Sequence, residues 1–84
     1  MKKKIRVTET IWNTTLKEEF AYHPTYDTIH ELKMHLAARL ADYFYRFGTI
    51  KYLINVESKP NEVIVTVKEI DGEYEAKDIY KWEL

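Results

Sequence analysis

Residues 28–48, TIHELKMHLAARLADYFYRFG, decide the fold of this 84-residue chain. Thr28 and Glu31 have the spacing of a capping box, which satisfies free backbone N–H groups at the start of a helix. Gly48 stands where a helix often ends on a left-handed residue. Between these signals, apolar residues recur at about 100° per residue. They predict one buried face of a long amphipathic helix: Ile29, Leu32, Leu36, Leu40, Tyr43, Phe44 and Phe47.

The segments on both sides of this helix alternate apolar and polar residues, which is the pattern of half-buried strands. Two such segments precede the helix and three follow it: residues 5–11, 15–23, 50–56, 63–68 and 76–84. The expected fold class is therefore α+β, with a single long helix packed on an antiparallel sheet of about five strands. Its element order is strand, strand, helix, strand, strand, strand, in one domain over residues 1–84. We expect the first and last strands to be neighbours in the middle of the sheet.

The first hairpin is expected to turn over two residues, Asn13-Thr14. This register matches apolar residues throughout, since it pairs Ile11 with Leu16, Val7 with Phe20 and Ile5 with Tyr22. It also places Glu9 directly opposite Glu18 on the apolar face, where like charges are unfavourable. Thr15 and Glu18 have the spacing of a capping box as well, so a short helix over residues 15–22 stays open as an alternative.

The last hairpin carries the strongest turn signal in the chain. Asp71-Gly72 predicts a type I′ turn, and the register that follows pairs Val67 with Ala76 and Val63 with Tyr80. Asp78 then falls on the apolar face, opposite Val65. Carboxylates in apolar surroundings acquire raised pKa values and are used as general acids. However, the sequence offers no nucleophile with a base and no glycine-rich phosphate loop, so we expect no catalytic residues and no enzyme.

Composition excludes several classes of protein. The net charge of −1 argues against a general polyanion binder, and the absence of cysteine excludes disulfides and thiolate-held zinc. No apolar run is long enough for a membrane span or a signal peptide, so we expect a cytoplasmic protein that does not bind membranes. Hydrophobic residues at 45% and charged residues at 32% are typical of a globular domain rather than a disordered chain.

Three histidines raise the question of a metal site. His30 and His35 lie about 140° apart around the helix and cannot share one ion, and no acidic residue is spaced to complete a site with His23. A charged helix face with opposite charges at i,i+3 and i,i+4 is expected to be solvated; it comprises Glu31, His35, Arg39, Asp42 and Arg46. The sequence therefore predicts no metal and no cofactor.

Two apolar surfaces exceed what a monomer needs. On the helix, a second seam with small residues in its middle lies more than 100° from the core stripe, and it consists of Met34, Ala38, Ala41 and Tyr45. On the outer face of the sheet, Ile64 is expected opposite Ile79 with Leu53 diagonal to Ile64. Exposed apolar patches mark interaction sites. The alternatives are that the sheet curls over the helix seam and buries it, and that the sheet residues reflect β-branched propensity alone.

These surfaces predict a small non-enzymatic protein-interaction module of the accessory regulator or inhibitor type, a class that includes phage-encoded and mobile-element proteins. It is expected to bind a protein partner or itself through the helix seam, with a two-fold homodimer favoured. The alternative is a nucleic-acid-binding regulator that uses a basic outer sheet face, made of Lys4, Arg6, Lys17, Lys51, Lys68, Lys77 and Lys81.

Overall fold

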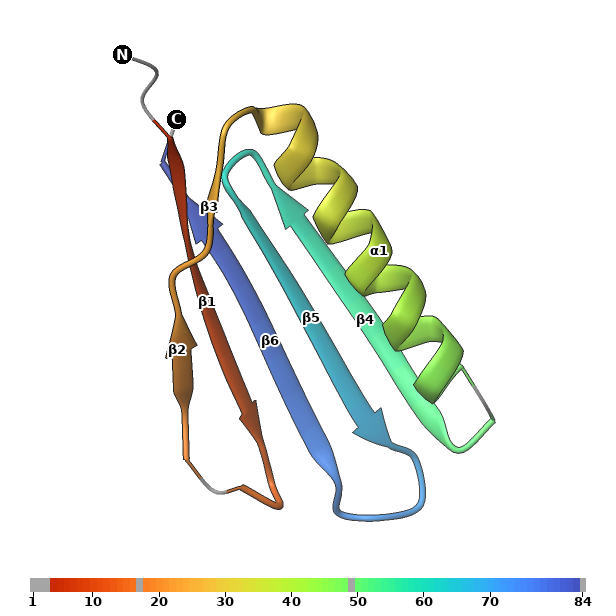
Figure 1. Cartoon of the computed structure of the whole chain (residues 1–84). Coiled ribbons are helices and arrows are strands. Elements are labelled where there is room, and N and C mark those ends of the chain that lie inside the picture. The colour runs from red at the N-terminus through yellow and green to blue at the C-terminus, as the bar shows by residue number, and fades with distance from the viewer. Residues whose placement is uncertain (1–3, 17, 49, 84) are drawn as a thin grey trace.

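One helix lies against one face of a twisted antiparallel sheet (Figure 1). The computed structural model describes residues 4–16, 18–48 and 50–83. The elements are, in chain order, β1 (Ile5–Asn13), β2 (Phe20–Tyr22), β3 (Thr25–Tyr26), α1 (Ile29–Phe47), β4 (Tyr52–Lys59), β5 (Glu62–Glu69) and β6 (Glu75–Trp82). The sheet order is β2-β1-β6-β5-β4, and β3 pairs with β1 as well.

The expected α+β class, with one helix on an antiparallel sheet, is confirmed. The first and last long strands are neighbours, as β1 pairs with β6 from Val7 to Asn13. The strand count and the exact order differ from the expectation, because the chain forms the extra strand β3 just after Pro24. The Pro24 carbonyl accepts a hydrogen bond from the Val7 N–H at 2.9 Å, between the two short strands. Thus β2 and β3 together line one edge of β1.

The first hairpin has a different register from the predicted one. Ile11 lies opposite Phe20 and Glu9 opposite Tyr22, so the three expected pairings are wrong. Relative to Ile11, the second strand is displaced from Leu16 to Phe20, a shift of four residues. The predicted contact between the two glutamates, which depended on that register, is therefore wrong as well.

The shift originates in the connection after β1. The Leu16 N–H donates to the Asn13 side-chain Oδ1 at 2.8 Å, and such Asn bonds to nearby backbone stabilise turns. Residues 14–16 form this turn and the following strand begins only at Phe20. The two-residue turn is therefore wrong, and so is the alternative of a helix over residues 15–22.

The start of α1 has the Thr28 half of the predicted capping box, while Glu31 bonds the N–H of the residue before the cap. Thr28 has an extended backbone, and its Oγ1 accepts a hydrogen bond from the Glu31 N–H at 3.2 Å. Glu31 in turn accepts from the Asp27 N–H at 3.2 Å. The end of the helix differs from the prediction, because Gly48 has φ −76° and is not left-handed. A glycine suits this place because a Cβ would collide with the Phe44 carbonyl oxygen.

The strands after the helix follow the predicted alternation. The pairings of Val67 with Ala76 and Val63 with Tyr80 are confirmed. Asp71-Gly72 does lie in the connection, but Gly72 lacks the positive φ that a type I′ turn requires. The connection between β4 and β5 is tight, with Lys59 opposite Glu62.

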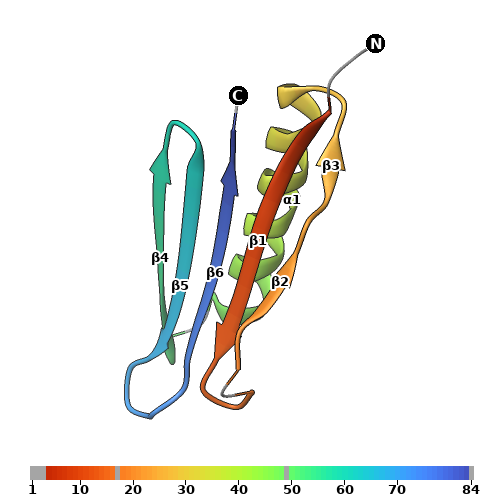
Figure 2. The ribbon, with the colours of Figure 1, turned by 90° about the vertical axis from the view of Figure 1, so that its left-hand side faces the viewer.

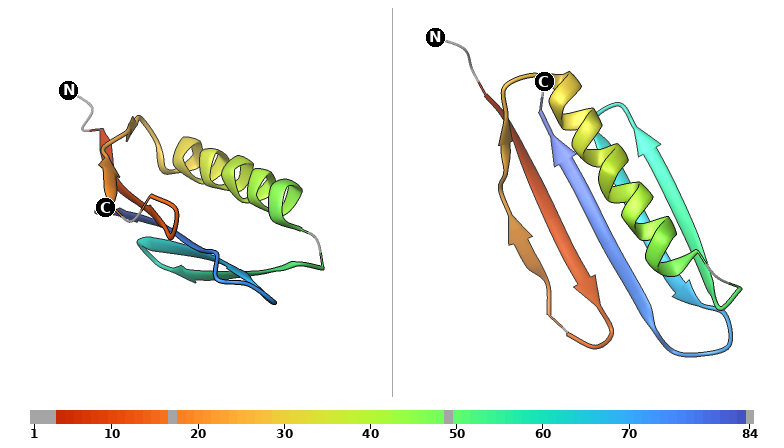
Figure 3. Two further views of the ribbon diagram at one scale, coloured as in Figure 1. Left: turned by 90° about the horizontal axis from the view of Figure 1, so that it is seen from below. Right: turned by 45° about the vertical axis from the view of Figure 1, so that its right-hand side comes forward.

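The core lies between α1 and the sheet (Figure 2). Its buried members come from the helix, β1, β5 and β6: Val7, Leu32, Leu36, Val63, Val65, Tyr80 and Trp82. The sheet bends so that β1, β2 and β3 rise on one side of the helix (Figure 3). At the far end, Phe47 packs edge-on against Tyr52 with ring centroids 5.2 Å apart. Phe44, expected in the core stripe, is 52% exposed, because it lies about 120° around the helix from Leu32.

Replacing Thr28 with Ala is expected to lower the free energy of unfolding by about 1 kcal/mol, since the Glu31 N–H loses its acceptor. Thr28→Ser keeps the hydroxyl and is the matched control, expected to remain close to wild type. Urea unfolding followed by circular dichroism measures both. An equal loss in the serine variant would show that the threonine methyl group, and not the cap, stabilises this end.

Candidate functional site

The outer side of α1 faces away from the sheet and carries the predicted seam. Met34 is 61% exposed and Tyr45 is 89% exposed, and Ala38 and Ala41 between them are exposed as well. The alternative in which the sheet curls over these residues is wrong, because the sheet lies on the opposite side of the helix (Figure 3). We call Met34, Ala38, Ala41 and Tyr45 the helix seam.

Two further exposed residues, Ala37 and Phe44, widen the helix seam along one flank. The other flank of the helix faces β1 and β3, where Arg39 reaches Glu9 and His35 packs on the Tyr26 ring. Phe44 lies about 140° around the helix from Arg39, so its flank points toward β4. Ala37 and Phe44 were detectable from their spacing of three residues from Met34 and Ala41, but the sequence favoured a core position for Phe44.

The second predicted surface, on the outer face of the sheet, is only partly assembled. Ile64 lies directly opposite Ile79, as expected, and both are half-buried. Leu53 lies opposite Lys68, whereas Ile64 lies opposite Glu57, four residues farther along β4. The predicted contact between Leu53 and Ile64 is therefore wrong, because the tight turn after Lys59 sets a different register between β4 and β5.

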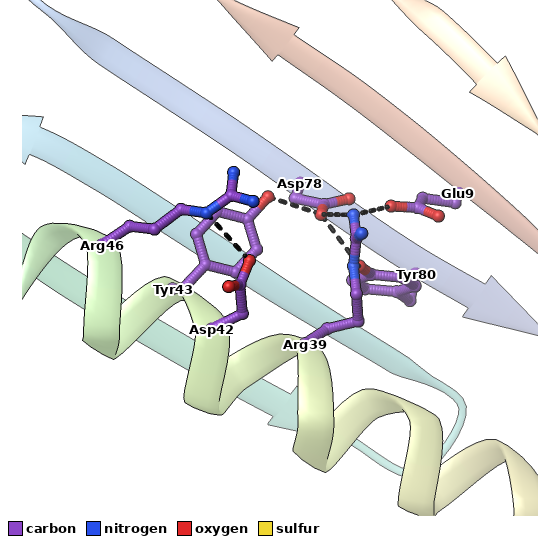
Figure 4. Close-up of polar contacts among 7 residues, drawn as sticks. All are labelled: Glu9, Arg39, Asp42, Tyr43, Arg46, Asp78 and Tyr80. Carbon is purple, nitrogen blue, oxygen red and sulfur yellow. Dashed lines mark hydrogen bonds and ion pairs between the residues drawn. The ribbon is translucent and has the colours of Figure 1, made fainter.

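Between α1 and the sheet lies a polar cluster of five side chains that the sequence did not predict as a unit (Figure 4). Two carboxylates, Glu9 on β1 and Asp78 on β6, are buried, with 7% and 1% of their surface exposed. Arg39 Nη2 lies 3.0 Å from Glu9 Oε2 and 3.5 Å from Asp78 Oδ2. Asp78 Oδ2 also accepts hydrogen bonds from the Tyr43 hydroxyl at 2.6 Å and the Tyr80 hydroxyl at 2.9 Å.

This cluster corrects one expectation about charges and confirms another. Arg39 does not belong to a solvated face, because its guanidinium turns inward and its Nε donates to the Tyr80 hydroxyl at 2.9 Å. Asp78 lies opposite Val65 on the helix side of the sheet, as expected. Glu18 is exposed and takes no part, so Glu9 is opposed by an arginine rather than by a second glutamate.

Burial and crowding of like charges dominate the electrostatics of this cluster. Burial raises the pKa of the Glu9 carboxyl above its ordinary value, and the charge of Asp78 and a hydrogen bond with it raise it further. Burial also raises the pKa of the Tyr43 and Tyr80 hydroxyls, with the hydrogen bonds to Asp78 adding to the effect. Two carboxylates therefore share one guanidinium, and Glu9 holds a proton more tightly than a free glutamate does.

The arrangement of these groups favours a structural role. Each of Arg39, Tyr43 and Tyr80 directs its polar atoms at a carboxylate or at a neighbour in the cluster, and Asp78 Oδ1 is buried without a hydrogen-bond partner among the described residues. No cluster residue lines either of the two hollows described below. The cluster therefore joins α1 to β1 and β6.

The hollows of the described surface include two that lie beside β1. The larger, about 590 Å³, lies at one end of β1 and β6 and is lined by Lys4, Ile5, Arg6, Thr8, Lys81, Trp82 and Glu83. The smaller, about 450 Å³, is lined by Trp12, Glu19, Glu75 and Lys77. Both mix acidic with basic side chains. Within residues 4–16, 18–48 and 50–83, no three His, Asp or Glu side chains are grouped to hold a metal ion.

Comparison with known proteins finds no match to a protein-family model, to a curated protein or to a solved structure. Among the described residues, no helix has the length and apolar character needed to cross a bilayer.

Glu9→Gln is expected to flatten the pH dependence of stability. In the wild type, the raised pKa of Glu9 makes the free energy of unfolding fall as pH rises above about 4.5, where unfolded glutamates ionise. The glutamine cannot ionise, so the variant should lose this fall and be at least as stable as the wild type at pH 7.

Urea unfolding at several pH values between about 4 and 8 measures this slope. Glu18→Gln is the matched control, because it makes the same substitution at an exposed position outside the cluster. A clear loss of stability in Glu9→Gln at pH 7, with the wild-type slope retained, would show that the pKa of Glu9 is not raised in the folded protein.

Proposed function

We propose that this protein is a non-enzymatic protein-interaction domain of the accessory regulator or inhibitor type, and that the helix seam is its binding surface. The observation that carries the proposal is the exposure of Met34, Ala38, Ala41 and Tyr45 along one line of a helix that is anchored on its other side. Contiguous exposed apolar patches are characteristic of interaction sites.

The dimensions of the helix seam suit another helix. From Met34 to Tyr45 it extends over about 16 Å, or three turns. Alanines at its centre allow a second helix to approach to the 8–10 Å of close helix packing. Met34 and Tyr45 at its ends supply larger surfaces, and methionine adapts to irregular partners. The seam therefore fits an amphipathic helix, from a protein partner or from a second copy of the chain.

The polar cluster supports the same conclusion by fixing the helix in its orientation. Arg39 on α1 contacts Glu9 on β1 and Asp78 on β6, while Tyr43 binds Asp78 one turn farther along. These directional bonds hold one side of the helix toward the sheet. The helix seam is therefore presented to solvent on a rigid element, which lowers the entropic cost of binding.

Ala38→Glu combined with Ala41→Glu tests the proposal. The double variant is expected to fold like the wild type and to lose capture of a protein partner from an extract of the source cells. Introducing two carboxylates into an apolar interface costs about 2 kcal/mol or more each, enough to reduce binding at least a hundredfold. Thr15→Glu with Thr25→Glu, at exposed sites outside α1, adds the same charge and should retain capture.

Circular dichroism and urea unfolding accompany this pull-down. An unfolded double variant would mean that the helix seam belongs to the core. A folded double variant that retains the same captured protein would place the binding surface elsewhere on the molecule.

The alternative function, nucleic-acid binding through the outer sheet face, has weaker support. Lysines there lie opposite acids, Lys68 with Glu75 and Lys81 with Glu62, and Lys59 forms ion pairs with two glutamates of its own hairpin. These acids offset the positive potential that a phosphate backbone requires. Lys17, which was counted with this face, lies outside the described residues.

We expect no salt-sensitive binding of the protein to fluorescent single-stranded or double-stranded DNA or RNA. Fluorescence anisotropy at about 50 and 200 mM salt measures it, because phosphate contacts weaken steeply over this range. Micromolar binding at the higher salt concentration that strengthens at the lower one would favour the nucleic-acid function.

A further inference from the structure

Strand β4 forms one edge of the sheet and, among the described residues, is hydrogen-bonded on one side only, to β5. The Ile70 N–H donates to the Lys51 carbonyl at 2.8 Å, just beyond the end of β4. Because hydrogen-bonded and non-hydrogen-bonded pairs alternate along an antiparallel ladder, the odd-numbered residues of β4 direct their peptide groups at β5. The even-numbered residues direct theirs outward, and they are Tyr52, Ile54, Val56 and Ser58.

This edge lacks four of the devices that block strand addition, which are bulges, prolines, inward-pointing charges and short length. Its two charged residues, Glu57 and Lys59, form an ion pair with each other. β4 pairs with β5 in unbroken register over its whole length, from Tyr52 to Lys59, and contains no proline. The residues on its helix side are uncharged. The opposite edge is protected, because β2 has only three residues and the chain then moves to β3.

The helix side of the β4 edge is apolar. Val56 is 36% exposed there, and Ile54 next to it contributes to the core. Phe44, 52% exposed, lies on the flank of α1 that points toward β4. A strand added beside β4 would therefore bury Val56 and Phe44 while it pairs with the outward peptide groups. A row of backbone donors and acceptors at two-residue intervals is complementary to another strand and to no other element.

We propose that a second copy of this chain pairs with β4 through its own β4, antiparallel, about a two-fold axis at Asn55. In this register Tyr52 lies opposite Ser58 of the second copy, and Ile54 opposite Val56 of the second copy. Apolar residues then meet twice on the helix side, and about eight backbone hydrogen bonds form. The two Asn55 side chains meet on the outer face, and Glu57 lies opposite Leu53 of the second copy. Lys59 lies opposite Lys51 of the second copy at each end, where ion pairs with Glu57 and Glu62 of its own chain offset the charge of Lys59.

The dimer has one continuous sheet, with both helices on the same face because the axis is perpendicular to the sheet. This pairing refines the proposed function and rests on it for the role of the helix seam. The second copy occupies β4, and each helix seam remains free for the helix of another protein. A dimer through the helix seam would instead leave the outward peptide groups of both β4 strands without a strand partner.

Val56→Pro tests the pairing. Proline removes an outward N–H and places its ring in the path of an incoming strand, yet it is tolerated on an edge strand where the N–H does not bond within the sheet. Val56→Thr keeps the N–H and a β-branched side chain and is the matched control. Sedimentation velocity at about 10–100 µM, a concentration range typical of weak dimers, compares these with the wild type and with Ala38→Glu/Ala41→Glu.

We expect the wild type, Val56→Thr and the helix-seam variant to be dimers, and Val56→Pro to be a monomer with the wild-type circular dichroism spectrum. A monomeric wild type, or a dimer that survives Val56→Pro, overturns the pairing. A dimer that is lost only in the helix-seam variant also overturns the β4 pairing, and it would show that the second copy binds at the helix seam. If Val56→Pro unfolds, Val56→Lys, which keeps the N–H, takes its place, and a dimer that persists overturns the proposal. Failure of the β4 pairing leaves the helix-seam proposal standing, because the pull-down tests the seam separately and a second copy at the seam is an occupant that the proposed function allows.

Discussion

The fold depends on one interaction between its two layers, the contact of the Arg39 guanidinium with the buried carboxylates of Glu9 and Asp78. Apolar packing alone would bring an amphipathic helix onto the sheet, but it allows several rotations about the helix axis with similar buried area. The charged contact permits only one of them, because an unpaired carboxylate at either position would remain buried without compensation. The Tyr43 and Tyr80 hydroxyls, which both bind Asp78, fix the same rotation.

That rotation decides which residues of α1 are available to partners. With Arg39 turned to β1 and β6, the opposite side of the helix, with Ala41 at its centre, faces solvent, and Phe44 overhangs the β4 side. This orientation has an electrostatic cost, because burial, and after it the charge of Asp78, raises the pKa of the Glu9 carboxyl. Buried ion pairs often add little to net stability. The contribution of this cluster is therefore better understood as orientation of the helix than as added stability.

The parts of the fold that local signals encode were predictable. The capping box of α1 and the alternation around Asp71-Gly72 gave the helix start and the β5–β6 register. The register of the first hairpin was not predictable from local signals. The Asn13 side chain accepts a hydrogen bond from the Leu16 N–H and closes a wider turn than the predicted two-residue turn. The polar cluster was detectable only as an anomaly, acids on an apolar face. The sequence did not reveal Arg39 as the partner of these acids, because Arg39 has regular i,i+3 and i,i+4 spacing among the other charged residues of α1. Its bonds to Glu9 and Asp78 join residues far apart in the sequence, so no local pattern signals them.

The unequal edges of the sheet follow from the same arrangement. One side of β1 pairs with β6 over most of the length of β1. The other side of β1 pairs first with β2 and then with β3, and between these two strands the Pro24 carbonyl accepts a hydrogen bond from the Val7 N–H. The chain that leads into the helix therefore covers one edge of the sheet. After the helix comes β4, and β5 and β6 then build inward toward β1, so no later segment within the described residues covers the other edge. A topology with its first and last strands in the middle thus leaves an outer strand exposed unless another chain pairs with it.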